Sequence, residues 1–271
     1  MTLTLALAQL EIRGGKPDEN RRRAIEAIET AVERNAGLVV LPEIFTTGYF
    51  AFESYGRTAE PVDGETVSTL ATVAADHGIG ILAGSIVEDL AASRDRGFET
   101  PADEGYANTS VFLDETGTVA GVYRKRHLFG YGSAEQELLT AGESLATVEF
   151  GGFTVGMTTC YDLRFPELYR ALVDEGVTLM LVPSAWPYPR VEHWQLLPRA
   201  RAVENLCYVA TVNGVGSFDD AELLGRSAVY DPWGTAVAAL GDESGVVTAH
   251  LDPATVEDRR TTFPALDDRR L

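Results

Sequence analysis

The sequence predicts an α/β protein in which two mixed β-sheets pack face to face and helices cover their outer sides. Short apolar runs, which are typical of buried strands, alternate with longer segments whose apolar residues recur at helical spacing. Other strand-like runs are separated only by short turns containing Gly, Asp or Pro, which predicts antiparallel hairpins within the sheets. The chain has 271 residues, a length that fits one large domain or two small ones.

The first third of the chain has a β-α-β-α-β pattern. A start signal at Pro17 and Asp18 and a C-cap at Gly78 mark helix ends. The expected strands are residues 3–9, 38–41 and 79–87, and the expected helices are residues 18–35 and 65–77. Residues 89–105 are rich in charge, Gly and Ala, and we expect a surface loop there.

The rest of the chain adds hairpins and further helix–strand pairs. Hairpin turns are expected at residues 114–117, at Gly151 and Gly152, and at residues 231–234. The expected strands are residues 108–113, 118–124, 147–150, 153–159, 177–182, 207–212 and 245–251, with a hairpin over 226–240 and helices at 166–175 and 191–206. The tail that follows is charged.

The charge balance argues against several classes of partner. The chain carries 22 Lys and Arg against 41 Asp and Glu, a formal net charge of -19. Because basic residues form no cluster, we expect no nucleic-acid partner, and the negative charge disfavours an anionic membrane surface. No apolar run approaches the roughly 20 residues of a membrane span. The N-terminus lacks the basic and small-residue signals of a secreted protein, so we expect a cytoplasmic location.

Cysteine and lysine usage is also informative. Two cysteines, Cys160 and Cys207, do not make a disulfide framework, and we expect both to be reduced. Only Lys16 and Lys125 are lysines, and the other basic residues are arginines. A high-salt cytoplasm explains both the acid excess and the few lysines, because salt screens the self-repulsion of net charge. The alternative is a high-GC genome that encodes Arg in place of Lys, combined with an ordinary acidic protein.

Three residues at the ends of expected strands carry reactive groups. Cys160 stands at a strand-to-helix turn, a position that lowers a thiol pKa and offers backbone N–H donors to an oxyanion. Glu43 follows a buried apolar strand, where a carboxylate is costly unless it is paired or reactive. Lys125 is retained where the chain otherwise uses Arg, which suggests a need for a compact ammonium. The structural alternatives are an inert buried thiol, a carboxylate that caps a loop and a solvated lysine.

Together these groups suffice for acyl transfer without histidine. The glutamate removes the thiol proton, the thiolate attacks a carbonyl, and the lysine neutralises the oxyanion. In α/β folds, sites are usually found at strand ends, where all three residues are expected.

The segments that contain these residues, LPEIF, YRKRHLF and CYDLRFPELYR, resemble the nitrilase superfamily of carbon–nitrogen hydrolases. Further similar segments are AQL near the start, PSAW at 183–186, HWQLLPRARAVEN at 193–205, NGVG at 213–216 and DPWG at 231–234. The resemblance implies a single domain over residues 1–271, a four-layer α-β-β-α sandwich, and assembly as a homodimer or larger homo-oligomer. We expect no cofactor, because thiol chemistry on an amide needs none. It also implies that Glu43 is the general base, Lys125 the oxyanion stabiliser and Cys160 the nucleophile.

The family also carries a second glutamate between the lysine and the cysteine. Glu135 fits best, with Glu137 as the rival, and the family role would be to orient Lys125. The backbone N–H of Tyr161 would be the second oxyanion donor.

The residues after the nucleophile resemble one branch of the superfamily. CYDLRFPEL, together with YRKRHLF, looks like the omega-amidase and deaminated-glutathione-amidase branch, which implies hydrolysis of a terminal amide, through a Cys thioester, on a carboxylate-bearing substrate. Arg164 would pair with that carboxylate or form a structural salt bridge. Tyr161 also belongs to the expected substrate-binding set. Tyr49, Trp186 and Asn213 would line the pocket or pack beneath it.

Other functions remain as alternatives. A papain-like enzyme would pair Cys160 with one of the four histidines, His77, His127, His193 and His250, of which His127 and His193 are the better placed. A metal site is disfavoured because the Cys and His residues lack ligand spacing. Within the superfamily, an N-carbamoyl amide hydrolase or a nitrile hydrolase is the alternative enzyme. A catalytically silent binding module is the non-enzymatic one.

Overall fold

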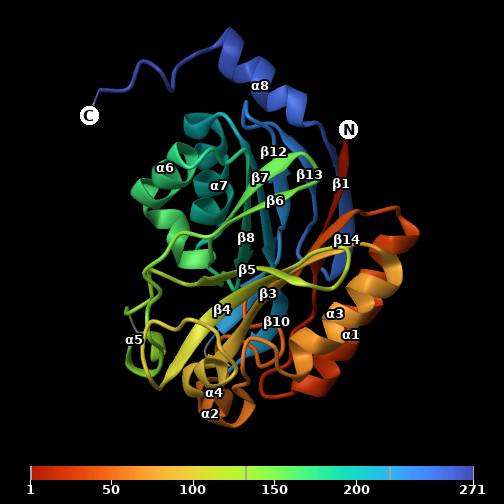
Figure 1. Cartoon of the computed structure of the whole chain (residues 1–271), viewed down its shortest axis with the longest axis vertical. Coiled ribbons are helices and arrows are strands. Elements are labelled where there is room, and N and C mark those ends of the chain that lie inside the picture. Colours follow the sequence, from red (N-terminus) through yellow and green to blue (C-terminus); the bar gives the residue numbers. More distant parts are fainter. Residues whose placement is uncertain (1, 132, 220, 271) are drawn as a thin grey trace.

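Two six-stranded sheets packed face to face form the centre of the computed structural model, which describes residues 2–131, 133–219 and 221–270 (Figure 1). The first sheet has the order β14 (Gly245–Leu251), β1 (Leu3–Gln9), β2 (Leu38–Val40), β3 (Gly80–Asp89), β4 (Tyr106–Leu113), β5 (Val119–Arg124). The second has the order β13 (Ala236–Ala239), β12 (Ala228–Tyr230), β9 (Tyr208–Asn213), β8 (Leu179–Ser184), β7 (Phe153–Met157), β6 (Thr147–Phe150). A separate two-stranded sheet pairs β10 (Val215–Phe218) with β11 (Ala221–Leu224).

Each large sheet is parallel at its centre and antiparallel at its edges. In the first, β2 pairs in parallel with β1 and β3, and in the second β8 pairs in parallel with β7 and β9. The outer strands β4, β5 and β14, and β6, β12 and β13, add antiparallel ladders. The carboxyl ends of the parallel strands therefore lie at one edge of each sheet, where α/β proteins place their sites.

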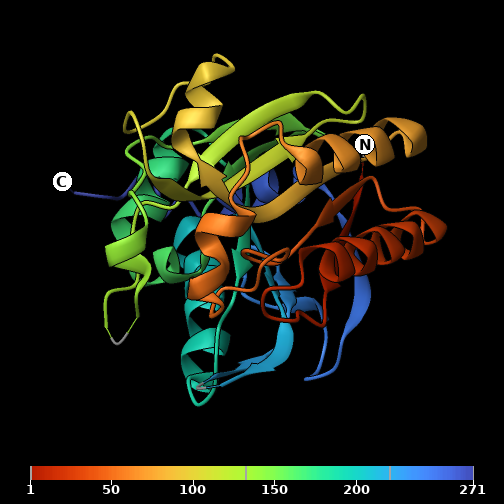
Figure 2. The ribbon, with the colours of Figure 1, turned by 90° about the horizontal axis from the view of Figure 1, so that it is seen from below.

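Helices cover the outer face of each sheet and complete four layers, α-β-β-α, as the sequence predicted. Helices α1 (Pro17–Glu33) and α3 (Glu65–His77) lie on the first sheet, and α6 (Pro166–Asp174) and α7 (Val191–Asn205) lie on the second (Figures 1 and 2). Shorter elements are η1 (Phe52–Ser54), α2 (Tyr55–Thr58), α4 (Leu90–Asp95), α5 (Glu135–Leu138), η2 (Cys160–Arg164) and the C-terminal α8 (Pro253–Thr262). In the part of the chain that the structure describes, no helix combines the length and apolar character needed to cross a membrane.

The strand alternation divides the apolar core into three layers. In β1, Leu5 and Leu7 face the second sheet, whereas Ala6 and Ala8 face the helices, because successive side chains point to opposite sides of a strand. In β8, Leu181 packs between the sheets and Val182 packs under α6 and α7. Both sheets are thus buried on both faces, which explains why their central strands are continuous apolar runs.

Two predicted irregular regions contain helices. The expected surface loop at 89–105 includes α4, because Asp89 caps it by accepting a hydrogen bond from the Ala92 N–H at 3.0 Å. The charged tail includes α8, where Asp252 accepts from the Ala254 N–H at 3.0 Å and Pro253 occupies the first turn. The strand predicted at 177–182 begins instead at Leu179, because Val177 and Thr178 lie outside the ladder.

Candidate active site

The two sheets bring Glu43, Lys125 and Cys160 together at their edge. Glu43 follows β2, and Lys125 comes directly after β5 in the first sheet. Cys160 begins η2 just after β7 of the second sheet, and Glu135 begins α5. Residues far apart in sequence therefore meet at the interface between the sheets.

Lys125 is the centre of a buried charge cluster. Its Nζ donates hydrogen bonds to Glu43 Oε1 at 2.8 Å and to the two oxygens of Glu135 at 2.9 and 3.0 Å. Only 1% of the lysine is exposed, and neither glutamate is exposed. Burial alone lowers the lysine pKa, but the charges of Glu135 and Glu43 outweigh it, so the pKa lies well above its ordinary value. The ammonium is therefore fixed in its charged form.

Glu43 is held by donors on both carboxylate oxygens. Besides Lys125, Oε1 accepts from Asn108 Nδ2 at 2.8 Å, and Oε2 accepts from the Ala185 N–H at 2.8 Å. Burial raises the pKa of Glu43, and the charge of Glu135 raises it further, against the opposing effect of Lys125. A carboxylate with a raised pKa is a stronger base, which suits proton removal from a thiol.

The Cys160 thiol lies close enough to Glu43 for the two groups to shift each other's pKa. The sequence predicted a lowered thiol pKa at the strand-to-helix turn, and this prediction was wrong. Burial raises the pKa of Cys160 well above its ordinary value, and the negative charge of Glu43 raises it further. The resting group is thus the neutral thiol, which must lose its proton to Glu43 as it attacks.

Backbone strain marks the turns beside two of these residues. Cys160 has φ 46° and Ile44, next to Glu43, has φ 42°, both in the left-handed region. That region is unusual for any L-residue and especially for a β-branched one. Ile44 is held there by the hydrogen bond from its N–H to Ser85 Oγ at 2.8 Å. Strain of this kind persists where the surroundings fix the backbone, and it is common at active sites.

Asn108, on β4, was not predicted from the sequence. Its Nδ2 donates to Glu43 Oε1 at 2.8 Å and to Glu135 Oε1 at 3.1 Å, so the amide bridges the two carboxylates and offsets their repulsion. The side chain is fully buried. The available signal was the polar run Asn108, Thr109 and Ser110 inside an apolar strand.

Asp162 was also not predicted from the sequence. Its Oδ2 accepts from the Tyr123 hydroxyl at 2.6 Å and from the Thr159 N–H at 2.9 Å. Its Oδ1 accepts from the His127 N–H at 3.1 Å and lies 2.7 Å from His127 Nδ1. Residues 123 and 127 flank the lysine, and residue 159 precedes the nucleophile. Asp162 therefore ties the lysine-bearing strand to the cysteine-bearing turn.

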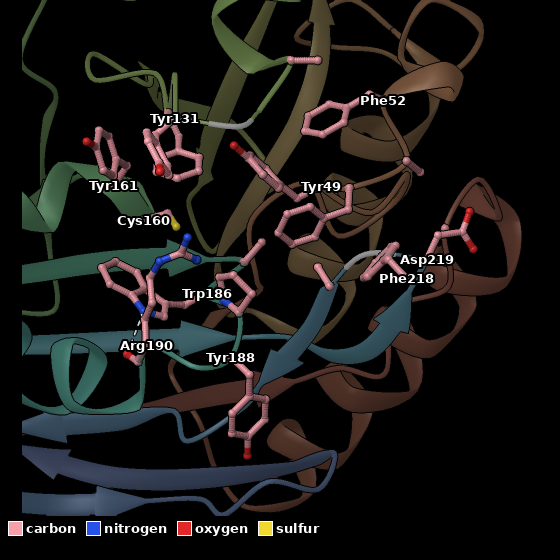
Figure 3. A pocket seen from close by; sticks show the side chains of 18 of the residues that line it. Tyr49, Phe52, Tyr131, Cys160, Tyr161, Trp186, Tyr188, Arg190, Phe218 and Asp219 are labelled. Carbon is pink, nitrogen blue, oxygen red and sulfur yellow. Dashed lines mark hydrogen bonds between the residues drawn. The ribbon is translucent and has the colours of Figure 1, made fainter.

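A cavity of about 810 Å³ opens at Cys160, and all four predicted substrate-binding residues line it: Tyr49, Tyr161, Arg164 and Trp186. Figure 3 shows Tyr49, Tyr161 and Trp186 around the cysteine. Tyr49 also donates from its hydroxyl to Glu135 Oε2 at 3.0 Å. Asn213 is not among the lining residues. It donates to the carbonyl oxygens of Trp186 and Gly225 at 3.1 and 3.0 Å, and so supports the cavity wall from beneath.

The two rival glutamates lie in different environments. Glu135 is buried against Lys125, and its Oε2 accepts from the Phe129 N–H at 2.6 Å, whereas Glu137 is exposed on the same short helix. Only Glu135 is therefore positioned to act on the lysine.

The two histidines considered as partners of Cys160 have other contacts. His127 lies against Asp162, and His193 Nδ1 lies 3.1 Å from an Nη atom of Arg164. The Arg164 guanidinium carbon lies 5.1 Å from the Trp186 ring centroid, and within the described ranges no ion pair includes Arg164. Among those same residues, no group of three or more His, Cys, Asp or Glu side chains is arranged to hold a metal ion.

Comparisons with known proteins identify the family of the chain. Residues 4–261 match the family model described as carbon-nitrogen hydrolase. The chain is 35% identical over 274 residues to 2-oxoglutaramate amidase of Paenarthrobacter nicotinovorans, covering 99% of this chain and 90% of that protein. It superimposes on Saccharomyces cerevisiae Nit3, a branch 10 member of the nitrilase superfamily, with TM-score 0.88 and 31% identity, covering 100% and 97% of the two chains.

A second solved structure relates to the chemistry. The amidase of Nesterenkonia sp. AN1, in a Glu-to-Gln variant, carries the acetamide moiety of fluoroacetamide covalently on its active-site cysteine. The present chain matches it with TM-score 0.81 and 31% identity, covering 97% and 95% of the two chains.

Proposed function

The chain belongs to the carbon–nitrogen hydrolase family and is an amide-hydrolysing enzyme; we propose that it removes ammonia from the terminal amide of a small substrate that also bears a carboxylate. The observation that carries this proposal is that the Cys160 thiol, beside the Glu43–Lys125 pair, lines the same cavity as an arginine, Arg164. The name of the Paenarthrobacter relative makes 2-oxoglutaramate the first candidate.

In the proposed acylation step, Glu43 takes the Cys160 proton as the sulfur forms a bond to the amide carbon. The carbonyl electron pair moves to oxygen, and the Lys125 ammonium and the Tyr161 backbone N–H stabilise the resulting oxyanion. Tyr161 follows the first residue of η2, and the first N–H groups of a helix have no partner within it. Lys125 has three N–H donors and three glutamate acceptor atoms around it, so one donor would serve the oxyanion when the two Glu135 oxygens share another.

Collapse of the tetrahedral intermediate breaks the C–N bond. Glu43, now protonated, donates its proton to the departing nitrogen, and ammonia leaves a thioester on Cys160. Glu43 then takes a proton from water as the water attacks the thioester. The second collapse releases the carboxylic acid, and the proton held by Glu43 returns to the thiol.

Arg164 would bind the substrate carboxylate. Its guanidinium contacts His193 and the faces of Trp186 and Tyr161, and these contacts do not occupy all five of its N–H donors. A guanidinium matches a carboxylate with two parallel hydrogen bonds, which favours an anionic substrate.

The test is ammonia release by the purified enzyme from four substrates at equal concentration. We expect kcat/KM for 2-oxoglutaramate to exceed that for butyramide, an N-carbamoyl amine and an aliphatic nitrile by at least about tenfold, the worth of one charge-assisted hydrogen bond. Preference for the carbamoyl compound or the nitrile would replace this proposal with one of the two alternatives within the family.

We also propose that residues 1–271 act as one catalytic domain without a cofactor, in the cytoplasm, as a homodimer or larger homo-oligomer. The family match over residues 4–261 supports the single domain, and two free buried thiols fit a reducing compartment. Light scattering coupled to size-exclusion chromatography tests the assembly, and a monomer would contradict it.

A further inference from the structure

A second arginine lines the same cavity as Cys160. Arg190 lies at the start of α7, and Figure 3 shows its side chain beside Trp186, on the side of the cavity that holds the nucleophile. Its guanidinium carbon lies 5.6 Å from the Phe129 ring centroid, and Phe129 in turn packs edge-on against Tyr161. Arg164 and Arg190 therefore both lie against the aromatic wall around Cys160.

Arg190 lines the cavity without the carboxylate partner that many arginines of this acidic chain have. Arg124 and Arg226, for example, pair with Glu88 and Asp242 at 2.7 and 2.6 Å. Among the described residues, the ion pairs include neither Arg190 nor Arg164, although the net charge is -19. An aromatic face attracts a guanidinium without occupying its N–H donors, so these donors stay available to a ligand.

The backbone of Arg190 is fixed to the floor of the cavity. Its carbonyl oxygen accepts from Trp186 Nε1 at 3.1 Å. Trp186 is anchored in turn by Asn213, which accepts from the Trp186 N–H at 2.8 Å and donates to the Trp186 carbonyl at 3.1 Å. Because Asn213 and Trp186 are buried, the backbone from which the Arg190 side chain extends is held in place.

We propose that Arg190 is a second anion-recognition residue, which binds the substrate carboxylate together with Arg164. This inference rests on the proposed function, and it narrows the substrate to amides whose anionic group is contacted by two guanidiniums. Two cations are needed here because Glu53 and Asp219 also line the cavity and, with the net charge of the chain, repel an anion. A carboxylate has about four acceptor positions, enough for both guanidiniums.

The test compares Arg190→Gln with the wild type on 2-oxoglutaramate and on uncharged butyramide. Loss of a hydrogen bond to a charged group costs about 1.5–3 kcal/mol, so KM for 2-oxoglutaramate should rise about 10- to 100-fold. The kcat/KM for butyramide should stay within about threefold, and Arg190→Lys should recover part of the lost affinity. Arg199→Gln, which removes a charge from an exposed position of α7 outside the cavity lining, is the matched control and should leave both substrates unchanged.

Three results would overturn the inference. An equal loss on both substrates would show that Arg190 only supports the fold of the cavity. An unchanged KM for 2-oxoglutaramate in Arg190→Gln, together with a raised KM in Arg164→Gln, would leave carboxylate recognition to Arg164 alone. A wild type without preference for 2-oxoglutaramate over butyramide would remove both this inference and the proposed substrate class.

Discussion

Replacing Glu135 by Gln tests the charge cluster around Lys125 most sharply. The substitution keeps the size of the side chain but removes one of the two carboxylates that bind Nζ at 2.9 and 2.8 Å. At an effective dielectric of about 20, two unit charges about 4 Å apart interact by about 4 kcal/mol, which corresponds to nearly three powers of ten in rate. The Gln carbonyl can still accept from Nζ, so we expect kcat to fall about 10²- to 10³-fold.

The pH profile separates this effect from general damage. Catalysis needs Glu43 ionised, so activity falls as the pH drops through its pKa, and the Glu135 charge is one cause of that raised pKa. Removing the charge lowers the pKa of Glu43, and the acidic limb of kcat/KM should move to lower pH. The Lys125 pKa falls as well, because Glu135 is the leading cause that raises it. The acidic and basic limbs of the pH profile give apparent pKa values that belong to the coupled cluster as a whole, not to single residues.

The matched control is Glu137→Gln, an exposed position on the same helix. The assay is ammonia release from pH 5 to 10, with the unfolding temperature measured for each variant. Glu137→Gln should behave as wild type. If Glu135→Gln keeps full activity, or if its acidic limb moves to higher pH, the role given to Glu135 is incorrect.

Three further predictions concern the nucleophile turn and the surface. Cys160→Ala and Cys160→Gly should both lack turnover. The Gly variant should be more stable to denaturant than the Ala variant by about 1 kcal/mol, because φ 46° strains any residue with a Cβ. An Ala variant more stable than the Gly variant would contradict the strain. Asp162→Asn should lower kcat about 10²-fold on charged and uncharged amides alike and leave KM unchanged, as expected when reacting groups shift by about 1 Å. A change in KM for only one of the two kinds of amide would count against a positioning role. Raising KCl from 0.1 to 1 M shortens the screening length from about 10 to 3 Å. Because this weakens the self-repulsion of the net charge, the unfolding temperature should rise, and a fall would refute the high-salt interpretation.

Much of the site could be predicted from local sequence. Glu43, Lys125 and Cys160 each follow an apolar strand, and α/β proteins usually place their sites at strand ends. The packing of the two sheets then brings Cys160, from the second sheet, to the two residues of the first. Burial of the central strands on both faces also follows from local patterns, since runs such as residues 38–41 are continuously apolar. The four-layer arrangement was implied by the family resemblance.

Other features depend on contacts between distant segments. Asn108 bonds to Glu43 and Glu135, which are 65 and 27 positions away, and Asp162 bonds to Tyr123 and His127, which are 39 and 35 positions away. The role of neither residue is therefore visible in its own segment of the sequence. The direction of the Cys160 pKa shift was wrong for the same reason, because burial and Glu43 set it rather than the turn itself. Arg190 was not predicted, because only the folded chain shows that it lines the cavity and has no carboxylate partner among the described residues.

The most direct test of the proposed chemistry is to trap the thioester. Acid quenching of the enzyme during turnover of 2-oxoglutaramate, followed by peptide mass mapping, should show the substrate less ammonia attached to the peptide that contains Cys160. Cys160→Ala should show no adduct and no ammonia release. Turnover by that variant, or an adduct on a different residue, would contradict Cys160 as the nucleophile.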